Sequence, residues 1–81
     1  MSTLRDAEKK RALCSRLARV EGQLRGIQKL IEEEAECEKV AQQLSAARKA
    51  LDKTFYVMLG CLIEAGQQPV SHVSDMLVKF A

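Results

Sequence analysis

The sequence is poor in aromatic residues, proline and histidine. Among its 81 residues there is no tryptophan, and there are one tyrosine, two phenylalanines, one proline and one histidine. Aromatic residues amount to 4%, whereas 47% of the residues are hydrophobic and 30% are charged. This composition is typical of a helical bundle or coiled coil rather than of a β-sandwich or a disordered chain. We therefore expect an all-α protein.

Long apolar runs are also missing. No stretch approaches the roughly 18 consecutive apolar residues of a transmembrane helix, and the first residues, MSTLRDAEKKR, lack the apolar segment of a signal peptide. We expect a cytoplasmic protein with no membrane partner, in a compartment where thiols stay reduced. Three cysteines, Cys14, Cys37 and Cys61, then indicate reactive or ligand roles rather than structural disulfides.

Enzyme motifs are absent as well. No histidine or aspartate accompanies a cysteine at the spacing of a nucleophile and its base, and the chain has no phosphate-binding loop or cofactor motif. His72 lies on the first turn of a short predicted helix, where an exposed histidine is more common than a ligand, and we assign it no role. The sequence predicts a protein that is not an enzyme.

What the sequence has in abundance is helical periodicity. Apolar residues recur every three or four positions, which predicts a first helix over 4–34, a second over 36–65 and a short third over 71–80. The chain 1–81 is then one domain with two long antiparallel helices and a short C-terminal helix. Such a domain is too small to enclose a sufficient core, so we expect it to oligomerise.

The expected helix ends have recognisable residues. Thr3 is the expected N-cap of the first helix, with Asp6 in its first turn. Gly66 and Pro69 end the second helix, and Ser71 caps the third. Inside the first helix are two glycines, at positions 22 and 26. Because each costs about 1 kcal/mol relative to alanine, we expect another helix to approach closely there.

The second helix begins and ends near a cysteine. Eight of its residues alternate at spacings of three and four, as in a heptad seam: Cys37, Val40, Leu44, Ala47, Leu51, Thr54, Met58 and Cys61. A rise of about 1.5 Å per residue separates the two thiols by about 36 Å, so they cannot meet in one chain. In an antiparallel pair related by a two-fold axis at Lys49, Cys37 would lie beside the partner's Cys61. Alternatively, cysteine fills these positions only as a small apolar residue.

A second apolar stripe lies beside this seam and is expected to receive the first helix. It consists of Ala41, Phe55, Leu59, Leu62 and Ile63.

The charges are unevenly distributed. Residues 1–30 hold eight basic and three acidic residues, a net charge of +5, and the remainder holds five basic and eight acidic residues, a net charge of −3. A basic first helix suits contact with phosphates, although a solvated charged face is the commoner explanation. A helical scaffold that does not bind DNA would explain the heptads equally well, and its association with DNA would be weak and insensitive to salt.

Two stretches resemble the copper-sensing repressor family, which includes nickel/cobalt, formaldehyde and persulfide sensors (CsoR/RcnR/FrmR-like proteins). They are RLARVEGQLRGIQKLIEEEAEC over 16–37 and QQLSAARKALDK over 42–53, and the similarity covers residues 10–65. The resemblance implies a dimer through antiparallel second helices, usually paired into a flat tetramer. It also implies a repressor that binds double-stranded operator DNA through the first two helices and releases it when an inducer binds at the dimer seam.

The resemblance also assigns residues. Cys37 matches the sensing cysteine of the family, and Arg16, Arg19 and Arg48 match its basic DNA-facing positions. To this DNA-binding set we add two further basic residues of the first helix, Lys9 and Arg25. Cys14 is a possible auxiliary thiol, with a structural role as the alternative.

The sequence departs from the family at the rest of the sensing site. Where copper sensors have histidine and a second cysteine, 25 and 29 residues after the first cysteine, this chain has Leu62 and Gly66, and it offers Cys61 instead. A site for nickel, cobalt or zinc would need imidazole or carboxylate near the thiols, and neither Leu62 nor Gly66 supplies it, so these metals are poor candidates. Two chemistries remain: a disulfide, persulfide or polysulfide bridge, or Cu(I) bound by two thiolates. The lost histidine favours reactive-sulfur or oxidant sensing without a required cofactor, and Cu(I) sensing through Cys37 and Cys61 is the alternative.

Overall fold

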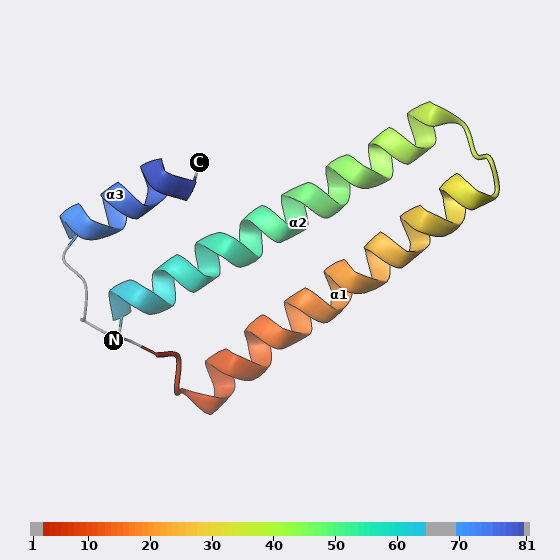
Figure 1. Cartoon of the computed structure of the whole chain (residues 1–81). Coiled ribbons are helices and arrows are strands. Elements are labelled where there is room, and N and C mark those ends of the chain that lie inside the picture. Colours follow the sequence, from red (N-terminus) through yellow and green to blue (C-terminus); the bar gives the residue numbers. More distant parts are fainter. Residues whose placement is uncertain (1–2, 65–69, 81) are drawn as a thin grey trace.

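The computed structural model describes residues 3–64 and 70–80, without the side chains of residues 64 and 70–73. It contains three helices: α1 (Ala7–Glu32), α2 (Cys37–Glu64) and α3 (Val70–Phe80). Helices α1 and α2 run antiparallel as a long hairpin, and α3 lies beside the C-terminal half of α2 (Figure 1). The all-α fold with two long helices and a short third one is confirmed.

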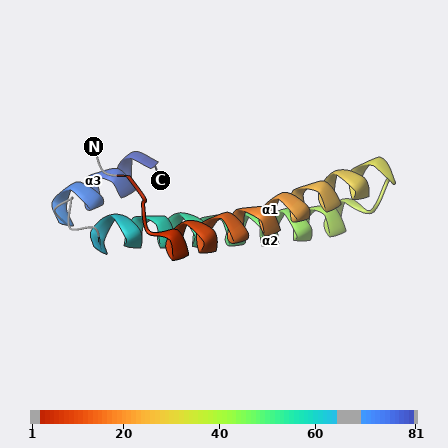
Figure 2. The same ribbon diagram turned by 90° about the horizontal axis from the view of Figure 1, so that it is seen from below.

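The molecule is long and flat. Its principal extents are 48 × 28 × 15 Å and its radius of gyration is 16.0 Å, compared with about 12 Å for a compact domain of this length. Seen edge-on, α1 and α2 form one layer and α3 lies on one face of that layer (Figure 2). None of the helices in the described part of the chain is long and apolar enough to cross a membrane.

The N-terminus of α1 corrects one expectation. The N-cap is Asp6, whose side chain accepts a hydrogen bond of 3.0 Å from the backbone N–H of Lys9, whereas Thr3 precedes the helix and its hydroxyl accepts from Nε of Arg5. Both residue types cap helices. Asp6 adds a negative charge at the positive end of the helix dipole, which favours it over Thr3.

The turn between α1 and α2 is a Schellman motif built without glycine. The N–H of Ala35 donates to the carbonyl of Leu30 at 3.0 Å, and that of Glu34 donates to Ile31 at 3.1 Å. Glu34 has a φ of 59°, the left-handed conformation in which glycine is usual because it has no Cβ. These two bonds satisfy carbonyls at the end of α1 and turn the chain back toward α2.

The core of the hairpin is a single row of buried side chains on each helix. On α1 it consists of residues spaced by seven, namely Leu13, Val20 and Ile27, and on α2 it consists of Ala47 and Thr54, which are also spaced by seven. Leu59 is buried as well, but it follows Thr54 by five residues and so lies on another side of α2. The hydroxyl of Thr54 donates to the carbonyl of Ala50 at 3.0 Å, so the buried polar group is satisfied. No described side chain is less than 2% exposed, which indicates an incomplete core.

This core corrects the predicted division of α2 into two stripes. Ala47 and Thr54, expected at a contact between protomers, are 3% and 6% exposed because they pack within the hairpin. Of the stripe expected to receive α1, Ala41 and Ile63 are exposed, and Leu59 is buried on a side of α2 other than that of Ala47 and Thr54. Heptad positions spaced by seven share a face, so α1 takes only one of the two series that make up the predicted seam.

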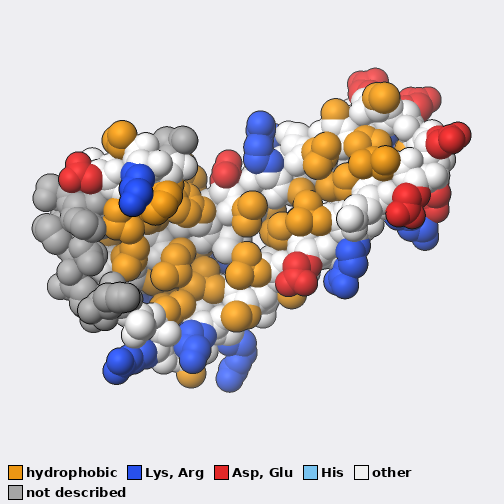
Figure 3. Space-filling model, viewed as in Figure 1, with side chains coloured by type: hydrophobic (Ala, Val, Ile, Leu, Met, Phe, Trp, Pro, Cys, Tyr) orange, Lys and Arg blue, Asp and Glu red, His pale blue; other side chains and the backbone are white. Residues whose placement is uncertain are grey.

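The other series on each helix remains open to solvent. Its members form what we call the open apolar face: Leu17, Leu24 and Ile31 of α1, and Leu44 and Leu51 of α2. They are 43–58% exposed. Apolar side chains gather between the two helices on the face seen in Figure 3. An exposed apolar stripe of this length marks an interaction surface.

Helix α3 is attached to α2 through aromatic residues. The rings of Phe55 and Phe80 meet edge to face with 6.3 Å between their centroids, and the ring of Tyr56 lies 5.7 Å from that of Phe55. The helix begins at Val70, so Ser71 lies within it rather than at its cap. The expected helix end at Gly66 and Pro69 lies outside the described residues.

The two glycines of α1 have no close neighbour from another element in the described part of the chain. A Cβ built on Gly22 or Gly26 would have no atom within 4 Å. The close approach expected there is therefore not made by α2, and contact with another protomer stays a prediction.

Candidate functional site

Cys37 is the first residue of α2 and its thiol is exposed. It lines an apolar groove of about 380 Å³ at the closed end of the hairpin, together with Ile31, Ala35, Val40, Ala41 and Leu44. Because Ile31 and Leu44 belong to the open apolar face, this groove continues that face up to the sulfur. The predicted sensing thiol therefore lies at one end of the unpartnered surface.

Cys61 lies at the opposite end of the same helix. Helix α2 is unbroken from Cys37 to Glu64, so the expected separation of about 36 Å between the thiols holds. Cys61 is half-buried, and all three cysteines are free. Among the described residues no three histidine, cysteine or acidic side chains cluster as a metal site. One chain therefore brings neither the two thiols nor a conventional ligand set together.

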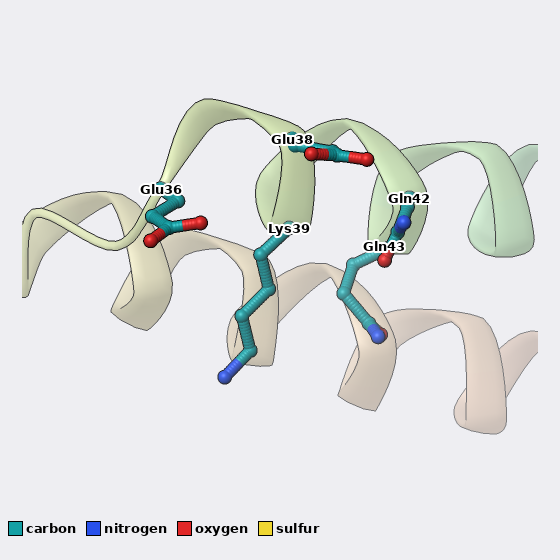
Figure 4. Close-up of a pocket in the computed structure, with 5 residues that line it drawn as sticks. All are labelled: Glu36, Glu38, Lys39, Gln42 and Gln43. Carbon is teal, nitrogen blue, oxygen red and sulfur yellow. The ribbon is translucent and has the colours of Figure 1, made fainter.

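The surroundings of Cys37 are strongly acidic. Five glutamates lie within five residues of it: Glu32, Glu33, Glu34, Glu36 and Glu38. On α2, Glu36 and Glu38 line a polar groove of about 410 Å³ with Lys39, Gln42 and Gln43. Lys39 and Gln43 extend toward the side where α1 lies (Figure 4). A cation near Cys37 would be attracted by these carboxylates and an anion would be repelled.

One sulfur residue escaped the sequence-based assignment. Met58 follows Cys37 by 21 residues, in the same seven-residue series as Leu44 and Leu51, and its side chain is half-buried. Its heptad position placed it on the predicted seam, but only as an apolar residue. The exposure of Leu44 and Leu51 now distinguishes this series from the one that faces α1.

The basic residues divide between two faces of the hairpin. Lys9, Arg16 and Arg19 share one side of α1, because they lie seven and three residues apart. Arg25 instead lines a groove of about 530 Å³ beside Leu24, on the open apolar face. Arg48 follows the buried Ala47 on the side of Leu44 and Leu51. One chain thus does not unite these residues in a single positive surface, and their contact with DNA stays a prediction.

Of the two remaining residues, Cys14 and His72, only Cys14 has a described side chain. Cys14 is exposed on α1, one residue after the buried Leu13. The side chain of His72 lies outside the described part of the chain. The auxiliary role of Cys14 stays a prediction.

Comparisons with known proteins identify a family and several relatives. The family described as metal-sensitive transcriptional repressor matches residues 9–77. The copper-sensing transcriptional repressor CsoR of Bacillus subtilis (strain 168) is 30% identical over 86 residues, which cover 94% of this chain and 85% of that protein.

Mycobacterial proteins also match. The copper-sensing repressors CsoR of Mycobacterium bovis (strain BCG / Pasteur 1173P2) and Mycobacterium tuberculosis (strain ATCC 25618 / H37Rv) are 43% identical over 51 residues, 63% of this chain. The match spans 43% of their length, less than half. No solved structure matches the chain significantly.

Proposed function

Because this chain belongs to the family of metal-sensitive transcriptional repressors, we propose that it binds operator DNA as an oligomer and leaves it when an inducer binds at Cys37 and the partner's Cys61. The observation that carries this proposal is the position of the exposed thiol of Cys37 at the end of the open apolar face. A second copy on that face would complete the site.

The occupant of the open apolar face is, in this proposal, a second copy of the chain. Leu44 and Leu51 are each 48% exposed and lie seven residues apart on one helix. An antiparallel copy related by a two-fold axis would therefore place leucine against leucine, which makes the face complementary to itself. The core of a single hairpin contains no fully buried side chain, so a second layer would supply the missing burial.

DNA binding rests on basic residues that the oligomer would repeat. Lys9, Arg16 and Arg19 lie on the flank of α1 away from the open apolar face, where Arg19 is exposed and the other two are half-buried. Dimerisation through the open apolar face would not cover them further. Arg25 and Arg48 would lie nearer the contact between copies. Contacts from lysine and arginine to phosphates position a protein on DNA and make its affinity fall steeply with salt.

Cu(I) is the inducer that we place first. The relatives are named as copper sensors, and thiolates bind this soft cation well. The carboxylates of Glu36 and Glu38 beside Cys37 would attract Cu(I) and repel anionic polysulfides. The replacement of the family histidine by Leu62, which favoured reactive sulfur from sequence alone, does not prevent coordination by sulfur ligands.

Reactive sulfur is the second candidate, supported by the exposure of the Cys37 thiol. A thiol that is open to solvent can be oxidised or persulfidated. The product would be a disulfide or polysulfide bridge between protomers, and no metal would be required.

Electrophoretic mobility shifts can test this proposal on a duplex selected from random DNA by the reduced protein. We expect Cu(I) to release the duplex from the wild-type protein and from Cys14→Ser, but not from Cys37→Ser or Cys61→Ser. Mass spectrometry under native conditions then identifies the inducer, because it distinguishes a bound copper ion from added sulfur atoms. A complex that persists with both Cu(I) and polysulfide would refute the proposal.

A further inference from the structure

Besides Cys37 and Cys61, the second helix carries a further sulfur residue, Met58, to which neither the family pattern nor the sequence assigns a role. This inference rests on the proposed function. It begins with the division of α2 into two series: Ala47 and Thr54 are buried against α1, whereas Leu44 and Leu51 are half exposed. Cys37 and Met58 continue the exposed series at its two ends, seven residues before Leu44 and seven after Leu51.

A two-fold axis that pairs the exposed leucines also pairs these end residues. If Leu44 meets the partner's Leu51, the axis passes between Ala47 and Arg48, and Cys37 then meets the partner's Met58. The axis predicted from the full heptad seam passes at Lys49 and brings the partner's Cys61 to Cys37 instead. Between the two placements, the residue of the partner that faces Cys37 shifts by three positions, or about 4.5 Å along the helix.

Met58 and Cys61 can therefore act on the same ligand. They are three residues apart on α2, a spacing that puts two side chains on one side of a helix. Both are half-buried in the single chain. In either placement of the axis, one of the two sulfur atoms lies opposite the thiol of the partner's Cys37 and the other lies about 4.5 Å further along the same helix.

We infer that Met58 is a ligand of Cu(I), in a site of three sulfur atoms shared by two protomers. Cys37 of one protomer supplies a thiolate, and the partner's Met58 and Cys61 supply a thioether and a second thiolate. Thiolate and thioether are the soft ligands that select Cu(I). Binding involves no electron transfer: the two thiols lose their protons to solvent and the thioether donates a lone pair.

The thioether replaces the imidazole that the family has at the position of Leu62. Leu62, at the family's histidine position, has no donor atom, whereas Met58 lies one helical turn before it and carries one. The sulfur-only set suits nickel poorly because nickel favours imidazole, and three sulfur ligands leave the tetrahedral coordination of zinc incomplete. Reactive sulfur would need only the two thiols, so a dependence on Met58 separates the two inducers.

The experiment compares Met58→Leu with Met76→Leu in the full-length protein. Leucine keeps much of the volume of methionine without its sulfur, and Met76 is a half-buried methionine of α3, which makes it a matched control. Competition with a chromogenic Cu(I) chelator should show affinity weakened about 10- to 100-fold in Met58→Leu, a loss that even supporting groups of metal sites produce. Met76→Leu should bind as the wild type does.

X-ray absorption at the copper edge gives a second readout that does not depend on comparing stabilities. Protein labelled with selenomethionine should show a copper–selenium distance in the wild type and in Met76→Leu, and none in Met58→Leu. Unlabelled wild-type protein should show three sulfur neighbours and Met58→Leu two. A wild-type site without selenium, or equal affinities of Met58→Leu and the wild type, would overturn the inference.

The same samples distinguish failure of this inference from failure of the proposed function. If Cu(I) releases DNA from the wild type and from Met58→Leu at the same concentration, Met58 is not a ligand but the repressor stands. If Cu(I) does not bind the wild type or release its DNA, copper sensing itself is refuted.

Discussion

Replacement of Leu44 by alanine should weaken the dimer without unfolding the hairpin. Leu44 lies on the open apolar face and is 48% exposed in the single chain, so about half of its hydrophobic contribution is made within the hairpin and the other half awaits a partner. The change therefore weakens association by about as much per copy as it weakens the hairpin. It leaves Ala47 and Thr54, which hold α2 to α1, untouched.

The expected magnitude follows from the carbon atoms removed. Leu→Ala removes three carbons, worth about 2.4 kcal/mol on full burial at about 0.8 kcal/mol each. Since half of the side chain is already covered, each copy would lose about 1.2 kcal/mol of association energy. The two-fold axis doubles this to about 2.4 kcal/mol per dimer, which raises the dissociation constant about 50-fold.

Sedimentation equilibrium over a range of protein concentrations measures this constant directly. The control is Val78→Ala on α3, because Val78 is 80% exposed and lies outside the open apolar face. We expect its effect to stay within about twofold, as for most surface substitutions. A wild-type protein that is monomeric throughout, or a Leu44→Ala protein that associates as the wild type does, would refute the placement of the dimer contact.

Three further predictions concern DNA, the turn and the core. Arg19→Ala should reduce the slope of log affinity for DNA against log salt concentration by about 1 for each phosphate that the side chain no longer neutralises. The control, Lys79→Ala on α3, should leave this slope unchanged. Equal slopes for Arg19→Ala and the wild type would show that Arg19 does not contact DNA. Glu34→Gly should raise the free energy of unfolding by about 0.5–1 kcal/mol in urea, because it relieves the positive φ, and Glu33→Gly, at a φ of −84°, should lower it. Ile27→Ala, at a residue 4% exposed, should lower the same quantity by about 2–4 kcal/mol, and a smaller loss would mean that the hairpin core is not closed there.

The sequence determined the helices and the distance between the thiols. Three- and four-residue spacing is a local property, so it predicted all three helices, and the ends of α1 and α2 differ from the predicted ones by at most three residues. Because no residue between Cys37 and Cys61 interrupts α2, their separation also followed from the number of residues. The N-cap of α1 did not follow from the sequence, because Thr3 and Asp6 can both accept a hydrogen bond from a backbone N–H of the first turn. Asp6 takes this position, and its negative charge interacts favourably with the helix dipole.

Only the tertiary structure decided which apolar series of α2 faces α1. Ala47 and Leu44 are three residues apart and both apolar, so hydrophobicity alone cannot tell the stripe that packs within the hairpin from the one left for a partner. The direction in which the chain leaves α1 determines which series of α2 faces α1. This direction depends on the left-handed conformation of Glu34, which the sequence does not indicate because glutamate rarely adopts it. The proposed pairing of Met58 with the partner's Cys37 depends on this rotation of α2, because it assumes that Leu44 and Leu51 face a second copy.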